Sequence, residues 1–312
     1  MYKLEQYTDS HYNLWNDFIQ RSKNGTFLFH RDFMEYHSDR FRDFSLLIFE
    51  GEKLVAVMPA NRAGEVLHSH QGLTYGGLVL ETSIGGEKVE EIFKALRDYL
   101  NDAGINSIKI KQILSIYHKT PAYELDYILY KHGGGLYRKD MNLAIDYSRP
   151  LAISKSKLKH FRRISAIGLE IRMDNDFGAF WNNVLIPRLA EKHNAKPVHT
   201  LDEIKLLHDR FPKNIIQYNV YHKDRILAGI TLFNFENVVK SQYGATTNEG
   251  EKLRALDYLF ITLIEEFKDK TSFFDMGTVT EGDGDYNKGL LKQKEELGCS
   301  IYTQDFYEIR TD

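Results

Sequence analysis

Residues 241–260 read SQYGATTNEGEKLRALDYLF, in which a polar loop containing Gly250 joins a strand to an amphipathic helix. The helix is predicted from a stripe of apolar residues at helical spacing: Leu256, Leu259, Phe260, Leu263, Ile264 and Phe267. A loop of this kind presents backbone amides at a helix N-terminus to an anion, typically a pyrophosphate. An ordinary capped connection between strand and helix is the structural alternative.

The elements around this loop indicate the fold class. Strands are predicted over 217–222, 226–235 and 238–245 before the loop, and over 273–276 after the helix. The first half of the chain repeats this order, with strands at 45–49 and 54–59, a helix around 92–100 and a strand at 107–110. Each half is a meander followed by a β-α-β crossover. This order predicts an α/β fold with a mixed sheet and helices on its faces.

Single residues also repeat between the two halves. Matches recur in the same order at an offset of roughly 165–172 residues: Trp15-Asn16 with Trp181-Asn182, Asp39-Arg40-Phe41 with Asp209-Arg210-Phe211, Leu54-Val55-Ala56 with Ile226-Leu227-Ala228, Tyr75-Gly76 with Tyr243-Gly244, and Tyr137 with Tyr302. Pro150 interrupts the pattern near the middle of the chain and disfavours helix before it. The sequence therefore predicts two domains, 1–148 and 149–312, with a shared cleft between them as the place for a small-molecule site.

Composition is that of a globular protein, which we expect to remain in the cytoplasm without stable membrane association. Of the 312 residues, 42% are hydrophobic and 27% charged, and no stretch approaches the roughly 18 apolar residues of a membrane span. The first residues, MYKLEQYTDS, lack the layout of a signal peptide. The net charge of −3 offers no general attraction to nucleic acid.

Cysteine and histidine usage predicts no metal site. Cys299 is the only cysteine, which excludes an internal disulfide framework and makes a small buried hydrophobe the expected role. The 12 histidines include no HExxH pair. The acidic loop 281–285 does not meet the spacing of a calcium-binding EF-hand.

One local exception to the acidic balance is the segment SKSKLKHFRRISAIGLEIRM, residues 154–173. Its cations form a positive face on a predicted helix: Lys155, Lys157, Lys159, Arg162 and Arg163. Such a face suits a nucleotide diphosphate, coenzyme phosphates or tRNA. A solvated helix surface is the alternative.

The strand, loop and helix at 241–260 resemble the acyl-coenzyme A segment of the GNAT acetyltransferase fold. The duplicated form resembles the tandem FemAB-like transferases, and segment 154–173 is similar to the basic helix that opens their second domain, where Arg162 would contact substrate. In the GNAT fold the splayed strand and loop hold the pantetheine and pyrophosphate. The resemblance assigns that role here to Tyr243, Gly244, Thr246, Asn248, Gly250, Lys252 and Arg254.

Residues 68–80, HSHQGLTYGGLVL, resemble a FemAB-like motif that leads toward the cleft between the domains. Gln71, Tyr75 and Gly76 would meet the substrate there, and His70 is a candidate general base because imidazole titrates near neutrality. A glycine-rich bend in a strand is the structural alternative.

Residues 273–298, FFDMGTVTEGDGDYNKGLLKQKEELG, resemble the family's Asp-x-Gly, then Asn, then a lysine four residues before a glycine. Lys294 would stabilise an oxyanion or bind phosphate, Asn287 would contact substrate, and Asp275 is a second candidate base. Gln293 and Leu297 depart from the aromatics that family members often carry. A carboxylate that caps the following loop is the structural alternative for Asp275.

The resemblance implies an N-acyltransferase. It would move an acyl group, acetyl in the first place, from acyl-coenzyme A on the second domain to an amine of a small molecule, a nucleotide sugar or another cell-envelope or polysaccharide precursor on the first. Two alternatives stay open. One is a FemAB-type transferase that uses aminoacyl-tRNA and a peptidoglycan precursor, although the long helical hairpin of such enzymes has no counterpart here. The other is a protein that binds a precursor without catalysis.

Overall fold

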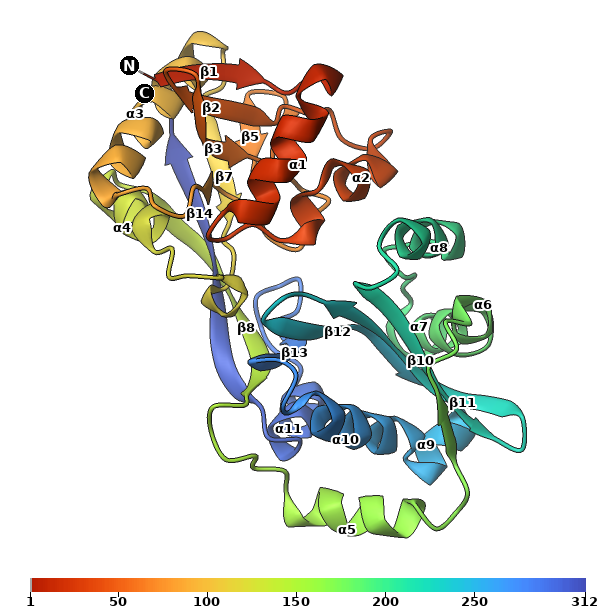
Figure 1. Ribbon diagram of the computed structural model, residues 1–312. Coiled ribbons are helices and arrows are strands. Elements are labelled where there is room, and N and C mark those ends of the chain that lie inside the picture. Colours follow the sequence, from red (N-terminus) through yellow and green to blue (C-terminus); the bar gives the residue numbers. More distant parts are fainter. Residues whose placement is uncertain (1) are drawn as a thin grey trace. The chain divides into compact units, whose positions relative to one another are not determined.

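The computed structural model describes residues 2–312, which divide into two compact units (Figure 1). Unit 1 contains the described residues up to Asp140 together with Thr303–Asp312, and unit 2 is the continuous stretch Met141–Tyr302. This division differs from the predicted boundary at 148/149. The border falls inside two long strands, β8 (Gly135–Asp146) and β14 (Ser300–Arg310), each of which contributes residues to both units.

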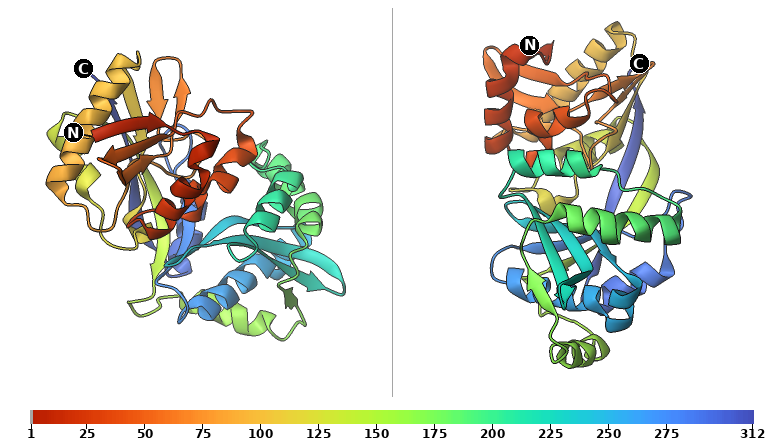
Figure 2. Two further views of the ribbon diagram at one scale, coloured as in Figure 1. Left: turned by 45° about the horizontal axis from the view of Figure 1, so that its top comes forward. Right: turned by 90° about the vertical axis from the view of Figure 1, so that its right-hand side faces the viewer.

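Unit 1 contains two sets of strands, which can be followed in Figure 2. The antiparallel set has the order β1 (Tyr2–Gln6), β2 (Leu46–Glu50), β3 (Lys53–Met58) and β6 (Val79–Leu80). The second set has the order β4 (Asn61–Ala63), β5 (Val66–His68), β7 (Ser107–Lys111) and β14. In this set β5 runs parallel to β7, while β14 runs antiparallel to β7.

The core of unit 1 lies between these strands and its longest helix. The helices of this unit are α1 (Tyr12–Arg21), α2 (Arg31–Met34), α3 (Gly86–Asp102) and α4 (Glu124–Lys131). Phe93 and Leu96 of α3 are fully buried and belong to the same apolar cluster as Ile108 and Ile110 of β7. Alternate residues of β7, Lys109 and Lys111, are only partly buried, as expected for a strand with one apolar face.

Unit 2 is built on a mixed sheet of the order β8, β13 (Phe273–Thr278), β12 (Val238–Thr246), β11 (Arg225–Asn234), β10 (Ile215–His222) and β9 (Glu170–Arg172). Within this order β12 and β13 are parallel, and the other recorded ladders are antiparallel. The turn between β10 and β11 has positive φ at Lys223 (51°) and Asp224 (61°), as in a type I′ hairpin. The predicted meander is confirmed to within two residues at each end.

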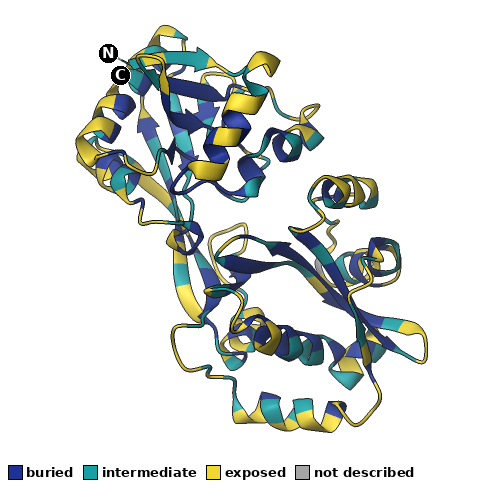
Figure 3. Cartoon of the chain, in the orientation of Figure 1, coloured by how far each residue is buried: buried dark blue, intermediate teal, exposed yellow. Residues whose placement is uncertain are grey.

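The helices of unit 2 include the predicted apolar stripe. They are α5 (Lys155–Ile164), α6 (Phe177–Phe180), α7 (Ile186–His193), α8 (Leu201–Arg210), α9 (Asn248–Leu253), α10 (Ala255–Phe267) and α11 (Lys288–Glu296), with a π-helical segment, Trp181–Leu185, between α6 and α7. Leu259 and Leu263 of α10 pack in one core with Ile230 of β11. Figure 3 shows that exposed and partly exposed residues predominate along α5. Among the helices of residues 2–312, none is both long and apolar enough to cross a bilayer.

Candidate functional site

Strands β12 and β13 of unit 2 diverge after a short paired stretch. Their parallel ladder runs from Val238↔Phe273 to Lys240↔Asp275, although β12 continues to Thr246 and β13 to Thr278. On its other side β12 stays paired with β11 as far as Thr246. The register of that pairing shifts beside Gln242, which is therefore an extra, bulged residue. The amide oxygen of Gln242 is buried and has no hydrogen-bond partner within the described chain.

Asp275 lies where the two strands begin to diverge, and it is fully buried. Its Oδ1 accepts hydrogen bonds from Asn142 Nδ2 (2.8 Å) and from the amide of Gly277 (2.7 Å), and its Oδ2 accepts one from Lys240 Nζ (3.1 Å). The carboxylate is thus held by three donors from β8, β12 and β13. The arrangement fixes the geometry of the divergence point.

Lys294 of α11 reaches the same place. Its ammonium, on a side chain that is only 5% exposed, donates to the carbonyl oxygens of Gly277 (2.9 Å) and Thr278 (3.0 Å). Burial and the positive charge of Lys240 lower the pKa of Lys294 to about 8. Two of the three ammonium donors are used by these carbonyls, so one N–H remains for a ligand. The structure thus brings the predicted residues Asp275 and Lys294 together.

Asn287 and Cys299, two further residues around α11, have structural contacts. Asn287 is the N-cap of α11, where its Oδ1 accepts a hydrogen bond from the amide of Leu290 (2.9 Å), and its Nδ2 donates to Glu281 (3.1 Å). Cys299 lies in the core of unit 2, where burial raises the pKa of its thiol to about 12. Asn287 therefore positions α11, and its contact with a substrate stays a prediction.

The loop that follows β12 is a capped connection. Thr247 accepts a hydrogen bond from the amide of Gly250 (3.0 Å), and Thr246 donates to the carbonyl oxygen of Leu227 (3.0 Å). A Cβ on Gly250 would lie 2.4 Å from that same carbonyl oxygen, so only glycine fits. Asn248 accepts from Arg188 (2.9 Å). Part of the predicted loop forms the short helix α9, and Arg254, whose φ is 55°, separates α9 from α10.

Positive charges gather near this break. Burial and then the charges of Arg254, Arg163 and Lys159 lower the pKa of His160 on α5, whereas the charge of Asp257 raises it. Lys157 of the same helix is not one of the exposed cations, because it is buried and its ammonium forms an ion pair with Asp257 at 2.7 Å.

Two other residues have exposed side chains: Lys252 on α9, which was predicted to bind the coenzyme, and Arg162 on α5, which was predicted to contact the substrate. Of the predicted positive face, Lys155, Lys159, Arg162 and Arg163 are exposed, whereas Lys157 is buried.

Tyr243 of β12 forms a hydrogen-bonded pair with His199, which was not predicted from the sequence. Its hydroxyl lies 2.6 Å from Nδ1 of His199 and accepts a hydrogen bond from the His199 amide (3.2 Å). The indole ring of Trp181 packs edge-on against Tyr243. Gly244, the next residue, is exposed. His199 lies in the segment between α7 and α8 without a recognisable motif, so no signal in the sequence links it to Tyr243.

The predicted residues 70–76 belong to unit 1. His70 is buried with a φ of 71°, and its ring stacks on that of His37 (5.1 Å between centroids). Gln71 is bonded to the Asn61 side chain through its own amide and its Oε1, each at 2.8 Å. The structure places Tyr75 in the interior, where its hydroxyl donates to Thr26 Oγ1 (3.1 Å).

At Gly76 another part of the backbone comes so close that only glycine fits. Its amide donates to the carbonyl oxygen of Lys111 (2.7 Å), and a Cβ would lie 1.9 Å from the carbonyl oxygen of Ser69. Close backbone packing therefore accounts for the glycine at this position, which agrees with the structural alternative of a glycine-rich bend. A shared cleft between the units, and substrate contacts of residues 70–76 within it, stay predictions.

His70 should make the protein sensitive to acid. Burial is the main cause that lowers its pKa from 6.5 to about 3, so between these pH values the unfolded chain binds more protons than the folded one. The contribution of this group to stability is complete above pH 6.5 and is lost as the pH falls toward 3. We expect the melting temperature of the His70→Asn variant to fall less than that of the wild type as the pH is lowered from 6.5 to about 3. His11→Gln, which removes a partly exposed imidazole from the same unit, serves as the control, and identical acid profiles for wild type and His70→Asn would contradict the prediction.

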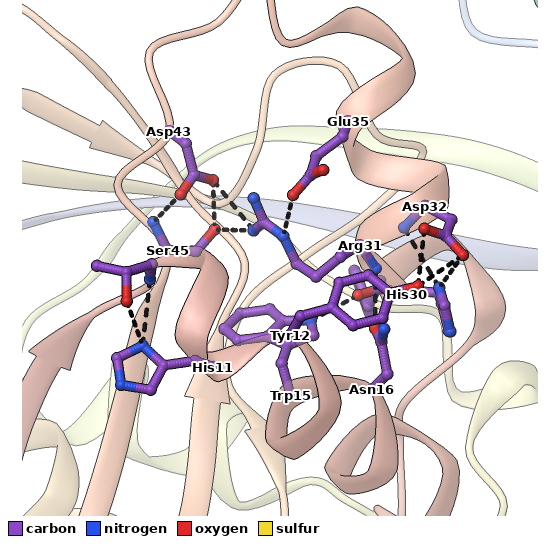
Figure 4. Close-up of polar contacts among 12 residues, drawn as sticks. His11, Tyr12, Trp15, Asn16, His30, Arg31, Asp32, Glu35, Asp43 and Ser45 are labelled. Atoms are coloured by element: carbon purple, nitrogen blue, oxygen red, sulfur yellow. Dashed lines mark hydrogen bonds and ion pairs between the residues drawn. The ribbon is translucent and has the colours of Figure 1, made fainter.

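A buried arginine in unit 1 was also missed by sequence reasoning. Figure 4 shows Arg31 of α2 between Glu35 (3.0 Å) and Asp43 (3.3 Å), and its guanidinium lies 3.7 Å from the centroid of the Tyr7 ring. Two carboxylates and an aromatic face compensate this cation, which is only 3% exposed. We assign it a structural role that ties α2 to the segment before β2. Its only signal in the sequence is a charged pair, Arg31-Asp32, within an aromatic stretch.

Solved structures show which fold this is, whereas no protein-family model and no curated protein matches the sequence. The structure of FemX is similar with a TM-score of 0.70 and 10% identity, over 98% of this chain and 96% of that one. L-PGS from Bacillus licheniformis is similar with a TM-score of 0.62 and 12% identity, over 97% and 92% of the two chains. A tandem GNAT protein from the clavulanic acid biosynthesis pathway gives a TM-score of 0.56 at 8% identity, over 100% and 99%.

The chain has a tandem GNAT-like fold. The predicted resemblance to tandem GNAT and FemAB-like proteins is confirmed at the level of the fold, as is the α/β class with a mixed sheet. Within this tandem GNAT-like fold, the part of the chain from residue 2 to residue 312 contains no group of three or more His, Cys, Asp or Glu side chains placed to hold a metal ion.

Proposed function

We propose that the protein is an acyltransferase and that unit 2 binds its donor, an acyl thioester of coenzyme A. The observation that carries this proposal is the divergence of β12 and β13 beside the buried ammonium of Lys294. Strand amides with a lysine that keeps one free donor form a site for the oxyanion that develops when an acyl carbonyl is attacked. The bulge at Gln242, with its buried, unpartnered amide oxygen, supplies an acceptor for an amide N–H of the pantetheine arm.

The proposed reaction is a direct transfer. The nitrogen of an acceptor amine attacks the thioester carbonyl carbon, the C–N bond forms, the C–S bond breaks and the amine loses a proton. We assign protonation of the departing thiolate to Tyr243, whose hydroxyl is bonded to His199. Asp275 already accepts three hydrogen bonds, so we propose that it positions Lys240 and the Gly277 amide. His70 remains the proposed base on the acceptor side, although its low pKa makes it a weak one.

The cations of α5 and Arg254 provide the proposed countercharge for the coenzyme phosphates. Arg254→Gln is expected to weaken binding of acetyl-coenzyme A about tenfold, because one charge-assisted contact to phosphate is lost. Lys205→Gln is the matched control, since Lys205 is an exposed cation of the same unit that lies on α8 and outside the α5 face.

The binding test is a thermal-shift titration, in which a ligand specific for the folded protein raises the melting temperature by mass action. Acetyl-coenzyme A, desulfo-coenzyme A and adenosine bisphosphate would separate the contributions of thioester and phosphates. Release of free thiol in the presence of candidate amines tests the transfer itself. No shift with any acyl-coenzyme A would count against this donor.

The exposed cations of α5 also favour a second candidate, a transferase that takes its acyl group from aminoacyl-tRNA, as the FemAB-like resemblance implies. Binding would then depend steeply on salt, because each phosphate contact releases counterions. A tRNA affinity that falls by orders of magnitude between low and moderate salt, with no response to acyl-coenzyme A, would favour this candidate. For either donor, the proposed acceptor is an amine on a nucleotide sugar or another cell-envelope precursor. Ligand binding without any turnover would favour a binding protein instead.

A further inference from the structure

Unit 1 contains a pocket on the face of its sheet opposite the apolar core. Its volume is about 260 Å³, and its lining includes His68, His70, Lys109, Lys111, Tyr137 and Phe306. The alternation along β7 explains its chemistry, since Ile108 and Ile110 pack in the core while Lys109 and Lys111 line the pocket. We call this the β7 pocket.

The register of the strands brings cations and rings side by side in the β7 pocket. His68 of β5 lies opposite Lys109, and Phe306 of β14 lies opposite Lys111. The Nζ of Lys109 is 5.6 Å from the centroid of the Tyr137 ring, and the Nζ of Lys111 is 5.6 Å from that of Phe306. These distances are typical of cation–π contacts, which orient each ammonium beside an aromatic wall.

The described residues that line the pocket include two lysines and no carboxylate. Lys109 approaches Glu308 at 3.6 Å, and both side chains are partly exposed, so solvent screens this pair. Burial and then the charge of Lys109 lower the pKa of His68, whereas the charge of Glu308 raises it. Lysine ammonium groups of this kind bind phosphate as point charges.

His70 adds a hydrogen-bond acceptor to the same pocket. It is one of the lining residues, and its Nδ1 is buried with no hydrogen-bond partner among residues 2–312. Its backbone adopts a left-handed φ of 71°, which is uncommon for residues other than glycine. An unsatisfied polar atom on a strained residue is an arrangement that clusters at ligand sites, because a ligand hydroxyl can satisfy it.

We propose that the β7 pocket binds a phosphorylated ring compound of the size of a monosaccharide phosphate. The phosphate lies against Lys109 and Lys111, the ring packs on Tyr137 and Phe306, and a hydroxyl donates to Nδ1 of His70. Sugar rings have the apolar faces that stack on aromatic side chains and the hydroxyl groups that serve this acceptor. Binding at the β7 pocket needs no acyl donor, so it can be measured whether or not unit 2 transfers an acyl group.

Calorimetric titration of the full chain with four probes tests this site. Glucose 1-phosphate represents the sugar phosphate, uridine monophosphate represents a nucleotide, and inorganic phosphate and glucose represent the separate parts. We expect glucose 1-phosphate to bind at least tenfold more tightly than inorganic phosphate or glucose. Tighter binding of uridine monophosphate than of glucose 1-phosphate would overturn the sugar assignment.

Variants locate the binding in the β7 pocket. Lys109→Gln and Lys111→Gln should each weaken glucose 1-phosphate about tenfold, whereas Lys94→Gln, which changes an exposed lysine on α3 of the same unit, should not. Tyr137→Ala should weaken glucose 1-phosphate and leave inorganic phosphate unchanged, because Tyr137 contacts only the ring. Equal affinity of inorganic phosphate and glucose 1-phosphate, or full affinity in both lysine variants with wild-type melting temperatures, would overturn the proposal.

Discussion

Replacing Lys294 by methionine is expected to lower the rate of acyl transfer by well over tenfold at saturating donor. Methionine keeps the length of the side chain and removes its charge and hydrogen-bond donors. Loss of one donor from an oxyanion site commonly slows acyl transfer by about 10²–10³-fold, because the charge that develops in the transition state loses its partner. The rate would be measured as thiol released from acetyl-coenzyme A in the presence of the acceptor.

Lys292→Met is the matched control, because Lys292 is exposed on the same helix, two residues away from the buried Lys294. Its rate should equal that of the wild type. The pH dependence separates a chemical role from a structural one. The pKa of Lys294 is about 8, so the wild-type rate should fall as the pH rises through this value and the ammonium loses its proton. A Lys294→Met variant with the wild-type rate and profile would remove Lys294 from the mechanism.

Asp275→Ala is expected to reduce the free energy of unfolding by about 3–5 kcal/mol, the usual loss when one partner of a buried ion pair is removed. Lys240, which is only 8% exposed, would lose the carboxylate with which it forms an ion pair. The amide of Gly277 and the side chain of Asn142 would lose their acceptor as well. Urea denaturation measures the loss, and turnover should fall by more than tenfold because the divergence point of β12 and β13 is no longer fixed.

Two comparisons test the origin of this loss. Asp283→Ala changes an exposed carboxylate in the loop before α11 and should alter the free energy of unfolding by less than about 0.5 kcal/mol. The double variant Lys240→Met/Asp275→Leu should recover part of the stability, because apolar residues of similar volume replace a buried ion pair at little loss. A decrease in Asp275→Ala no larger than that in Asp283→Ala would contradict the ion-pair explanation.

The helices and strands that could be predicted from the sequence are those whose hydrophobic pattern depends only on neighbouring residues in the chain. The stripe of Leu259, Phe260, Leu263 and Ile264 predicted α10, because 3.6-residue periodicity depends only on neighbours in the chain. The strand patterns over 217–222 and 226–235 predicted β10 and β11 for the same reason. The break at Arg254 could not be predicted, since a left-handed arginine has no signature in its own sequence.

The candidate site was predicted only in part, because its partners come from distant segments. Asp275 and Lys294 were singled out by the resemblance of residues 273–298 to a FemAB-like motif, but the contact of Asp275 with Asn142 depends on how β8 pairs with β13. The partner of Tyr243, His199, lies 44 positions earlier. Tyr75 is fully buried, and from sequence alone a tyrosine that fills a core cannot be distinguished from one that lines a cleft.

The pairing of β14 with β7 determines the order in which the two units are completed during synthesis. Residues 307–310 pair with residues 107–110 of β7, and the Thr311 hydroxyl donates to the carbonyl oxygen of Ile105 (2.6 Å). A ribosome makes unit 2 before it makes residues 303–312, which belong to unit 1. Unit 1 therefore begins before unit 2 and is completed after it, whereas domains usually fold in the order of their synthesis. Until residues 303–312 leave the exit tunnel, one edge of β7 stays open, and the continuous unit 2 is the part of the nascent chain that can close first.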